Sequence, residues 1–125
     1  MEVYSNHKLV IYQLMTRLFG NKVTTNKPHG SIEENGVGKF NDITDAALDG
    51  IKELGVTHIW YTGVIEHALV TDYTAYGIPL DHPDVVKGKA GSPYAIKDYY
   101  DVNLDLAVDV KNRIVEFDNL ISRTH

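Results

Sequence analysis

The sequence predicts an α/β fold with parallel strands, and three observations support this prediction. Two short apolar segments, residues 9–15 and 56–64, have the composition of strands. Between them, residues 43–54 repeat apolar side chains at helical spacing. The connection from this helix to the second strand is short, which favours a right-handed crossover unit. We therefore expect residues 9–15 and 57–64 to be adjacent parallel strands.

The first expected strand is the almost continuously apolar run Leu9-Val10-Ile11-Tyr12-Gln13-Leu14-Met15. Its length suits a strand better than a helix, and its composition is typical of a strand buried on both faces. The segment from Gly20 to Gly38 is polar and rich in turn-forming residues, so we expect a long loop there.

The first expected helix carries apolar residues at spacings of four, four and three, namely Ile43, Ala47, Ile51 and Leu54. Asn41 or Thr44 could cap its N-terminus, and Gly55 stands where a helix commonly stops. The β-branched and aromatic run after Gly55 predicts the second strand.

From Ile65 to about Val102 no hydrophobic period is sustained, and glycine and proline recur. A helix is then expected near residues 108–122, with an apolar repeat formed by Val110, Ile114, Phe117 and Ile121. Asp109 and Arg113 have the spacing of an ion pair on that helix.

Two strands and two helices make a very small parallel sheet, and parallel sheets are normally covered by helices on both faces. The sequence also stops at His125, where a further strand would be expected to begin. We therefore expect residues 1–125 to form one incomplete domain. The alternative is a complete small α+β domain whose central segment contains additional strands.

Composition narrows the classes of function. The formal net charge of -5 argues against nucleic acid as a partner, because phosphate binding needs a basic surface. No apolar run is long enough to predict a membrane span. The segment Met1 to Lys8 lacks the apolar core of a signal peptide, although a leader could have been removed. The absence of cysteine identifies no compartment, so localisation stays open, with a periplasmic or extracellular parent protein allowed.

No metal site or cofactor is expected from the sequence. The six histidines are scattered without ligand spacing: His7, His29, His58, His67, His82 and His125. The glycines of Gly36-Val37-Gly38 do not directly follow a strand, so a phosphate-binding loop is not expected either.

The segment Tyr94-Ala95-Ile96-Lys97-Asp98-Tyr99-Tyr100-Asp101-Val102-Asn103 resembles one in the alpha-amylase family of glycoside hydrolases. Ile11-Tyr12-Gln13, followed by Arg17-Leu18-Phe19, looks like the first barrel strand of that family and its exit. Residues 54–64 look like the second strand, and the last helix with His125 looks like the approach to the third. The resemblance lies in this ordered set rather than in any single motif.

The resemblance implies the N-terminal portion of a (β/α)8 TIM-type barrel, roughly the first two β/α units with a long loop after the second strand. It also implies retaining chemistry on α-glucosidic bonds of starch-like glucans, with two carboxyl groups about 5 Å apart. In the family these carboxylates lie on later strands, so none is expected in this chain and the isolated chain should be inactive. Hydrolases, transferases and isomerases share this region.

Two alternatives to an enzyme fragment stay open: a small fold unrelated to carbohydrate, and a non-catalytic glucan-binding or interaction module. Such a module would hold glucan with Tyr73, Tyr76 and Tyr94 and would carry out no chemistry. Self-association of the chain is also expected if the barrel is incomplete, because strand edges and apolar surface would then lack cover.

The resemblance implies that the ring of Tyr94 stacks on a sugar next to the scissile bond. The resemblance also implies that Asp98 helps to hold the loop and the pocket wall, and it leaves open whether Asp98 contacts sugar or has a structural hydrogen-bonding role. Ser92 and Pro93 stand where the family often has histidine or glycine, so a histidine contact with sugar is not expected there.

His67, with its neighbour Glu66, follows the second strand and is a candidate for the pocket mouth, against the alternative of loop structure. No partner carboxylate is assigned to Glu66. Trp60 is expected in the barrel core. Some family members bind calcium after the first strand, but residues 20–32 contain no acidic residue and that site is not expected here.

Overall fold

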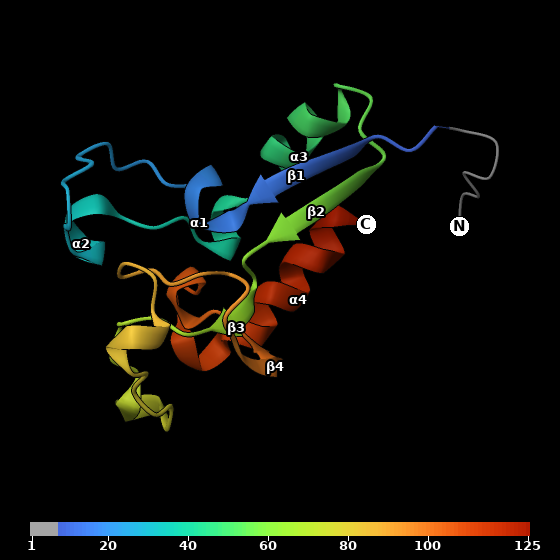
Figure 1. Cartoon of the computed structure of the whole chain (residues 1–125). Helices are drawn as coiled ribbons and strands as arrows, with labels where there is room; N and C mark the ends of the chain where they lie inside the picture. The colour runs from blue at the N-terminus through green and yellow to red at the C-terminus, as the bar shows by residue number, and fades with distance from the viewer. Residues whose placement is uncertain (1–7) are drawn as a thin grey trace.

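The computed structural model describes residues 8–125, and its larger sheet joins two strands that are distant in sequence (Figure 1). β1 (Ile11–Met15) and β2 (His58–Thr62) pair in parallel, with Ile11 opposite His58 and Met15 opposite Thr62. This confirms the predicted adjacency and direction of the strands. The prediction that the N-terminus lacks a signal-peptide core concerns residues that lie mostly outside the described range. His7 also lies outside that range.

One face of this sheet is packed and the other is open. Successive side chains along a strand point to opposite faces. Leu14 is buried, and Tyr12, Ile59 and Tyr61 pack against the same core as Ile43 and Ile51 of the first crossover and Leu120 near the C-terminus. The opposite set, which we call the open face, consists of Ile11, Gln13, Met15, His58, Trp60 and Thr62.

The open face corrects two predictions. Ile11 is 60% exposed and Trp60 is 52% exposed. β1 is therefore not buried on both faces among the described residues, and Trp60 is not a core residue there. The physical reason is that the helices carrying Ile51 and Leu120 cover the same side of the sheet, while the buried core within residues 8–125 includes no side chain of the open face.

The first crossover helix, α3 (Asp45–Lys52), begins at Thr44, whose hydroxyl accepts a hydrogen bond from the Ala47 amide at 3.2 Å. Thr44 rather than Asn41 is therefore the cap. The helix is shorter than predicted at both ends: Ile43 precedes it and is fully buried, whereas Leu54 follows it and is 71% exposed. Gly55 adopts a positive φ of 83° just beyond the helix, as expected for a stop.

The segment between β1 and α3 is not entirely loop. It contains α1 (Thr16–Phe19), α2 (Ile32–Asn35) and the short 3-10 helix η1 (Phe40–Asp42). α2 begins with a capping box, in which Ser31 and Glu34 each bond the other's backbone amide. A single helical turn is too short to produce a hydrophobic period, which is why the sequence did not predict it.

A second sheet, antiparallel and two-stranded, lies within the segment predicted to lack regular structure. β3 (Ile65–His67) pairs with β4 (Ile96–Val102), and the pairing shifts register on both sides of Glu66. The short 3-10 helices η2 (Thr74–Tyr76) and η3 (Pro83–Val85) lie between these strands. The prediction was thus wrong at the two ends of the segment, and additional strands do occur there.

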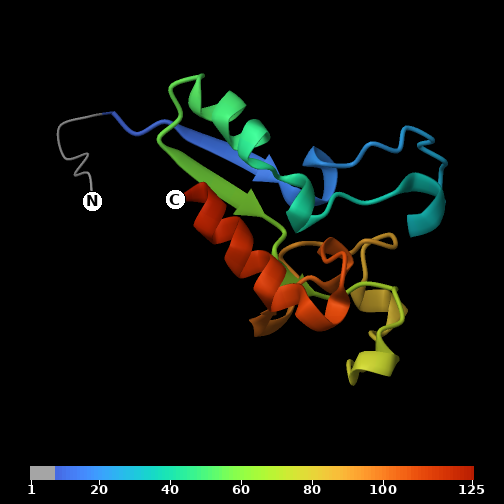
Figure 2. The ribbon, with the colours of Figure 1, turned by 180° about the vertical axis from the view of Figure 1, so that it is seen from behind.

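The chain closes with η4 (Leu104–Leu106), η5 (Val110–Asn112) and the long helix α4 (Arg113–Thr124), which runs alongside the parallel strands in both ribbon views (Figures 1 and 2). Arg113 pairs with Asp101 rather than with the predicted Asp109. The carboxylate of Asp109 instead accepts bonds from the Lys111 amide and the Asn112 side chain. No helix within residues 8–125 combines the length and the apolar character that a membrane span needs.

Candidate binding surface at the carboxyl ends of the parallel strands

The carboxyl ends of β1 and β2 lie at one edge of the sheet because the strands run in the same direction. Gln13 and Thr62, side by side on the open face, are joined by a hydrogen bond of 3.0 Å from Nε2 to Oγ1. The segments that follow both strands begin at this edge. In parallel α/β folds this is the edge at which ligands bind.

The loop that carries Tyr94 reaches this edge. Gly63 directly follows β2 and has a positive φ of 81°, which favours glycine. A Cβ atom at Gly63 would lie 3.7 Å from Cβ of Pro93 and 3.8 Å from Cε of Met15. Pro93 therefore packs where the two strands end, and its neighbour Tyr94 is 78% exposed there. The ring is exposed to solvent, and its predicted contact with sugar stays a prediction.

A buried polar network lies beneath these loops, and the sequence did not predict it. Asp105, which is 1% exposed, accepts a hydrogen bond from Nη1 of Arg17 at 3.0 Å and one from the Tyr73 hydroxyl at 2.5 Å. Nζ of Lys39 donates to the backbone carbonyl of Asp105 at 2.6 Å. Three segments distant in sequence are thereby fixed to one residue.

The network also affects proton affinities. Burial, and then the bonded carboxylate of Asp105, raise the pKa of the Tyr73 hydroxyl far above its ordinary range. Burial lowers the pKa of Lys39, and Asp105 acts in the opposite direction. Tyr73 is therefore neutral and donates its proton to the carboxylate. A structural role follows, because Asp105 has no exposed surface left for a ligand.

His67 is 4% exposed. Its Nε2 donates to the carbonyl of Ala90 at 2.9 Å, and its Nδ1 lies 3.3 Å from the carbonyl of Ile65. These are the contacts of a residue that anchors the loop before Tyr94. A sugar would reach Nε2 only if the Ala90 contact opened, so the geometry favours the structural alternative for His67.

Glu66, Asp98 and Asp101 come together between β3 and β4, and we call them the acidic cluster. The sequence assigned no partner carboxylate to Glu66, whereas in the structure it has two. Glu66 is 4% exposed, and its pKa is raised by burial first and by the charge of Asp101 next. The pKa of Asp101 is lowered by its hydrogen bonds from Arg113.

Asp98 is exposed on β4, and its Oδ1 accepts a hydrogen bond from the Tyr100 amide at 2.8 Å. This bond fits the structural role that the sequence left open beside a contact with sugar, and the sugar contact stays a prediction. Asp98 shares the acidic cluster with Glu66, so the structure does bring these two sequence candidates together.

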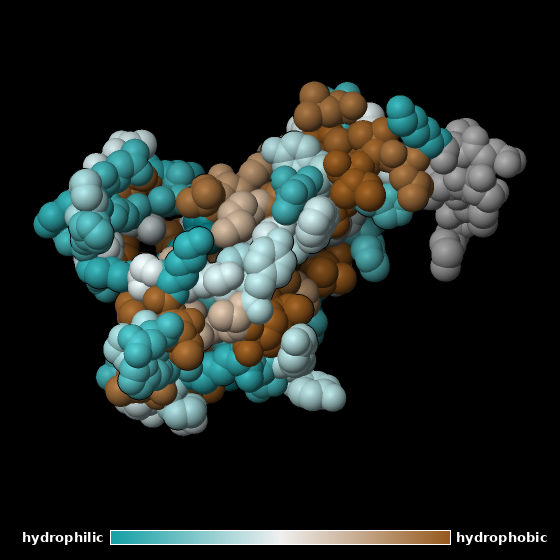
Figure 3. All heavy atoms as spheres, viewed as in Figure 1, coloured by the Kyte–Doolittle hydropathy of each residue, from teal (hydrophilic) through white to brown (hydrophobic). Residues whose placement is uncertain are grey.

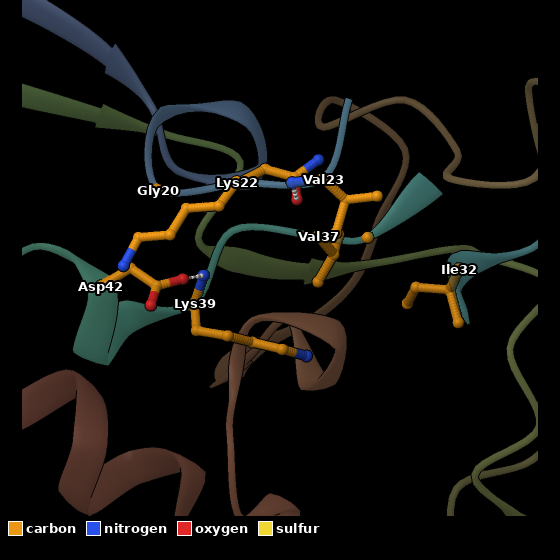
Figure 4. Close-up of a pocket in the computed structure, with 9 residues that line it drawn as sticks. Gly20, Lys22, Val23, Ile32, Val37, Lys39 and Asp42 are labelled. Carbon is orange, nitrogen blue, oxygen red and sulfur yellow. Dashed lines mark hydrogen bonds between the residues drawn. The ribbon is translucent and has the colours of Figure 1, made fainter. Parts of the chain in front are cut away.

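A hollow of about 330 Å³ lies in the loop after β1 (Figure 4). Its lining includes Lys22, Val23, Val37, Lys39 and Asp42. The carboxylate of Asp42 accepts a hydrogen bond from the Lys39 amide at 2.9 Å, so the one acidic group in the lining already has a partner. None of the site residues predicted from the sequence lines this hollow.

The three tyrosines expected to hold glucan in a non-catalytic module do not form a continuous platform. The rings of Tyr73 and Tyr76 contact each other edge to face, with centroids 6.2 Å apart. Tyr94 has no ring contact with either of them within residues 8–125. The ring exposed at the strand ends is therefore that of Tyr94, while Tyr73 is held by Asp105.

Comparisons of this protein with models of protein families, with curated proteins and with solved structures found no match. The proposed function therefore depends on this geometry and on the sequence resemblance alone.

Proposed function

We propose that this chain is the N-terminal portion of an alpha-amylase-type (β/α)8 barrel enzyme that acts on α-glucosidic bonds of starch-like glucans. In this proposal Tyr94 forms part of the sugar-binding wall. The catalytic carboxylates belong to later strands, so residues 1–125 bind or position substrate without cleaving it.

The observation that carries the proposal is the open face of the parallel sheet. A parallel sheet is ordinarily covered on both faces. Here both helices pack on one face, while Ile11 and Trp60 are exposed on the other. In a barrel the helices form an outer ring and the opposite faces of the strands form the packed interior. The open face has the position and composition of such an interior.

The position of Tyr94 supports the same proposal. Barrel enzymes bind substrate at the carboxyl ends of the strands. Pro93 and Met15 each lie beside Gly63 at those ends, and Tyr94, the residue after Pro93, is exposed. An exposed aromatic ring can stack on the apolar face of a pyranose.

The alternative is a non-catalytic glucan-binding module, and the exposure of Tyr94 is compatible with it. The gene sequence after codon 125 distinguishes the two proposals. An aspartate-rich strand and then Asn-His in that sequence would support the enzyme. A native stop codon directly after codon 125 would contradict the enzyme and leave the module.

The test is to express the gene from residue 1 to its natural stop codon and to assay reducing sugar released from maltoheptaose. We expect turnover by the full product. Tyr94→Ala should lower kcat/KM by about tenfold or more, the scale of one lost stacking contact. Tyr100→Ala, which removes a ring that is 96% exposed, is the matched control and should act as wild type. Equal activity of the Tyr94 and Tyr100 variants would contradict the assigned role of Tyr94.

A further inference from the structure

The acidic cluster brings three carboxylates together on the smaller sheet. Glu66 comes from β3, and Asp98 and Asp101 come from β4. One oxygen of each lies within 4.8 Å of the others. Strand pairing places Glu66 opposite Asp98, and the register shifts beside Glu66 bring Asp101 into the same group. The backbone of both strands therefore fixes the cluster.

Glu66 is the unusual member. Its residue is 4% exposed, yet its carboxylate accepts no hydrogen bond from any group within residues 8–125. A buried charged group normally has a partner, because removal from water costs several kcal/mol otherwise. Oxygens of two further carboxylates lie within 4.8 Å of this one. The buried carboxylate thus points at negative charge and lacks a donor.

The nearby cations do not supply that partner. Arg113 donates from Nε and Nη2 to the two oxygens of Asp101, both at 2.8 Å. Nζ of Lys97 lies 3.0 Å from Oδ1 of Asp81 and 2.5 Å from the carbonyl of Pro79, so its hydrogen bonds go to groups outside the cluster, although its charge lowers the pKa of Glu66. Among residues 8–125, Arg113 is therefore the cation that bonds the cluster, and it bonds Asp101, so Glu66 and Asp98 receive no hydrogen bond from a cation.

We propose that Glu66, Asp98 and Asp101 bind a calcium ion, with water completing the coordination on the exposed side of Asp98. Calcium takes six to eight oxygen ligands at about 2.3–2.6 Å. Two oxygens bound to one ion at about 2.4 Å can be at most about 4.8 Å apart, and the three oxygens meet that limit. Asp101 can bind the ion while it remains paired with Arg113, because a carboxylate oxygen has more than one lone pair.

The chemistry favours calcium over the other common divalent ions. Zinc prefers nitrogen and sulfur ligands, and the cluster contains neither. Magnesium demands near-ideal octahedral geometry at shorter distances and gives up its water reluctantly. The calcium site does not depend on the proposed glucosidase function. It lies between β3 and β4, and a bound ion would stabilise that sheet whether or not the protein is an enzyme.

The test is calcium titration of the 125-residue chain after removal of metal with EDTA, followed by calorimetry and by thermal unfolding. We expect one calcium per chain and a rise in Tm with calcium concentration. Glu66→Gln and Asp98→Asn should each weaken binding by tenfold or more. The matched control is Asp118→Asn, an exposed carboxamide substitution on α4, which should bind as wild type.

Asp98→Asn keeps the test decisive if Glu66→Gln does not fold, because Asp98 is exposed. Absence of heat and of any Tm change in wild type up to millimolar calcium would overturn the proposal. Wild-type affinity in both cluster variants would also overturn it. Equal affinity for magnesium would overturn the assignment of the ion as calcium.

Discussion

Nη1 of Arg17, two residues after β1, donates a hydrogen bond of 3.0 Å to Oδ2 of Asp105, which lies 88 residues later in the chain. The carboxylate of Asp105 is inaccessible to solvent, and Tyr73 donates to its other oxygen. This ion pair thus joins the loop after the first strand to the segment after β4. It holds both loops at the edge of the sheet where Tyr94 is exposed.

We predict that Arg17→Met destabilises the chain by about 3 kcal/mol, the scale for a buried ion pair that loses one partner. The loss arises because the buried carboxylate of Asp105 keeps its charge without its cation. Urea unfolding followed by circular dichroism measures it. Lys27→Met is the control, since it breaks an exposed pair with Glu34 and should change the midpoint little. Equal effects of the two variants would contradict the structural role of Arg17.

The elements that the sequence predicted correctly are those with a local signal. The parallel strands and the helix after Thr44 are each visible in the spacing or composition of consecutive residues. The boundaries were less accurate, because Ile43 is buried by tertiary packing although it precedes the helix. The spacing of apolar residues indicates which side chains are buried. Because buried side chains also occur just outside a helix, this spacing does not fix the residue at which the helix begins.

The parts that the sequence did not predict depend on pairing between distant residues. β3 is three residues long and gives no period. Asp105 bonds Arg17 and Tyr73, and Glu66 lies near Asp98. These residues are far apart in the sequence, so no pattern in consecutive residues indicates that they meet. Tyr94 was suggested by the resemblance; the structure shows that its side chain is exposed, and its role in binding sugar stays a prediction.

We predict that Tyr61→Phe costs about 1 kcal/mol at pH 7, the net value of one hydrogen bond. The Tyr61 hydroxyl lies 2.8 Å from Oγ1 of Thr124 and so joins β2 to the end of α4. Urea unfolding of the variant measures the change. Tyr100→Phe removes a hydroxyl from a residue that is 96% exposed and should leave the midpoint unchanged.

The burial of the Tyr61 hydroxyl also predicts how the stability of the protein changes at alkaline pH. Burial raises the pKa of Tyr61 above its ordinary value of 10.0. A tyrosine that ionises more readily in the unfolded chain stabilises the unfolded state once the pH exceeds that ordinary value. The stability difference between wild type and Tyr61→Phe should therefore shrink as the pH rises above about 10. A difference that stays constant from pH 7 to 11 would contradict the burial of this hydroxyl.

We predict that the isolated 125-residue chain releases no reducing sugar from soluble starch or maltooligosaccharides. The reason lies in the carboxylates that are present. Retaining hydrolysis needs a free nucleophile and an acid about 5 Å apart. In the acidic cluster Asp101 is held at both oxygens by Arg113, and Glu66 is buried. Turnover that persists after rigorous purification and is lost in Glu66→Gln would contradict this prediction.

The last prediction concerns self-association through the open face. Exposed strand edges can pair with other chains, and exposed apolar surface favours association. β1 and β2 pair only with each other among residues 8–125. The open face exposes Ile11 and Trp60, and a further apolar area lies where β1 begins and α3 ends, where Leu9 and Leu54 are exposed (Figure 3).

The experiment uses the single tryptophan of the chain, Trp60, as an internal probe. Sedimentation velocity over a range of concentrations should show reversible oligomers, and the fluorescence of Trp60 should shift to shorter wavelength as they form. Trp60→Ser should weaken association, because it removes the largest apolar side chain of the open face. Leu80→Ser, at a residue that is 64% exposed in the segment between β3 and β4, is the matched control and should associate as wild type. A folded monomer with no oligomer at millimolar concentration would contradict this prediction. It would show that the open face is stable in water and does not need to be covered by further parts of a barrel.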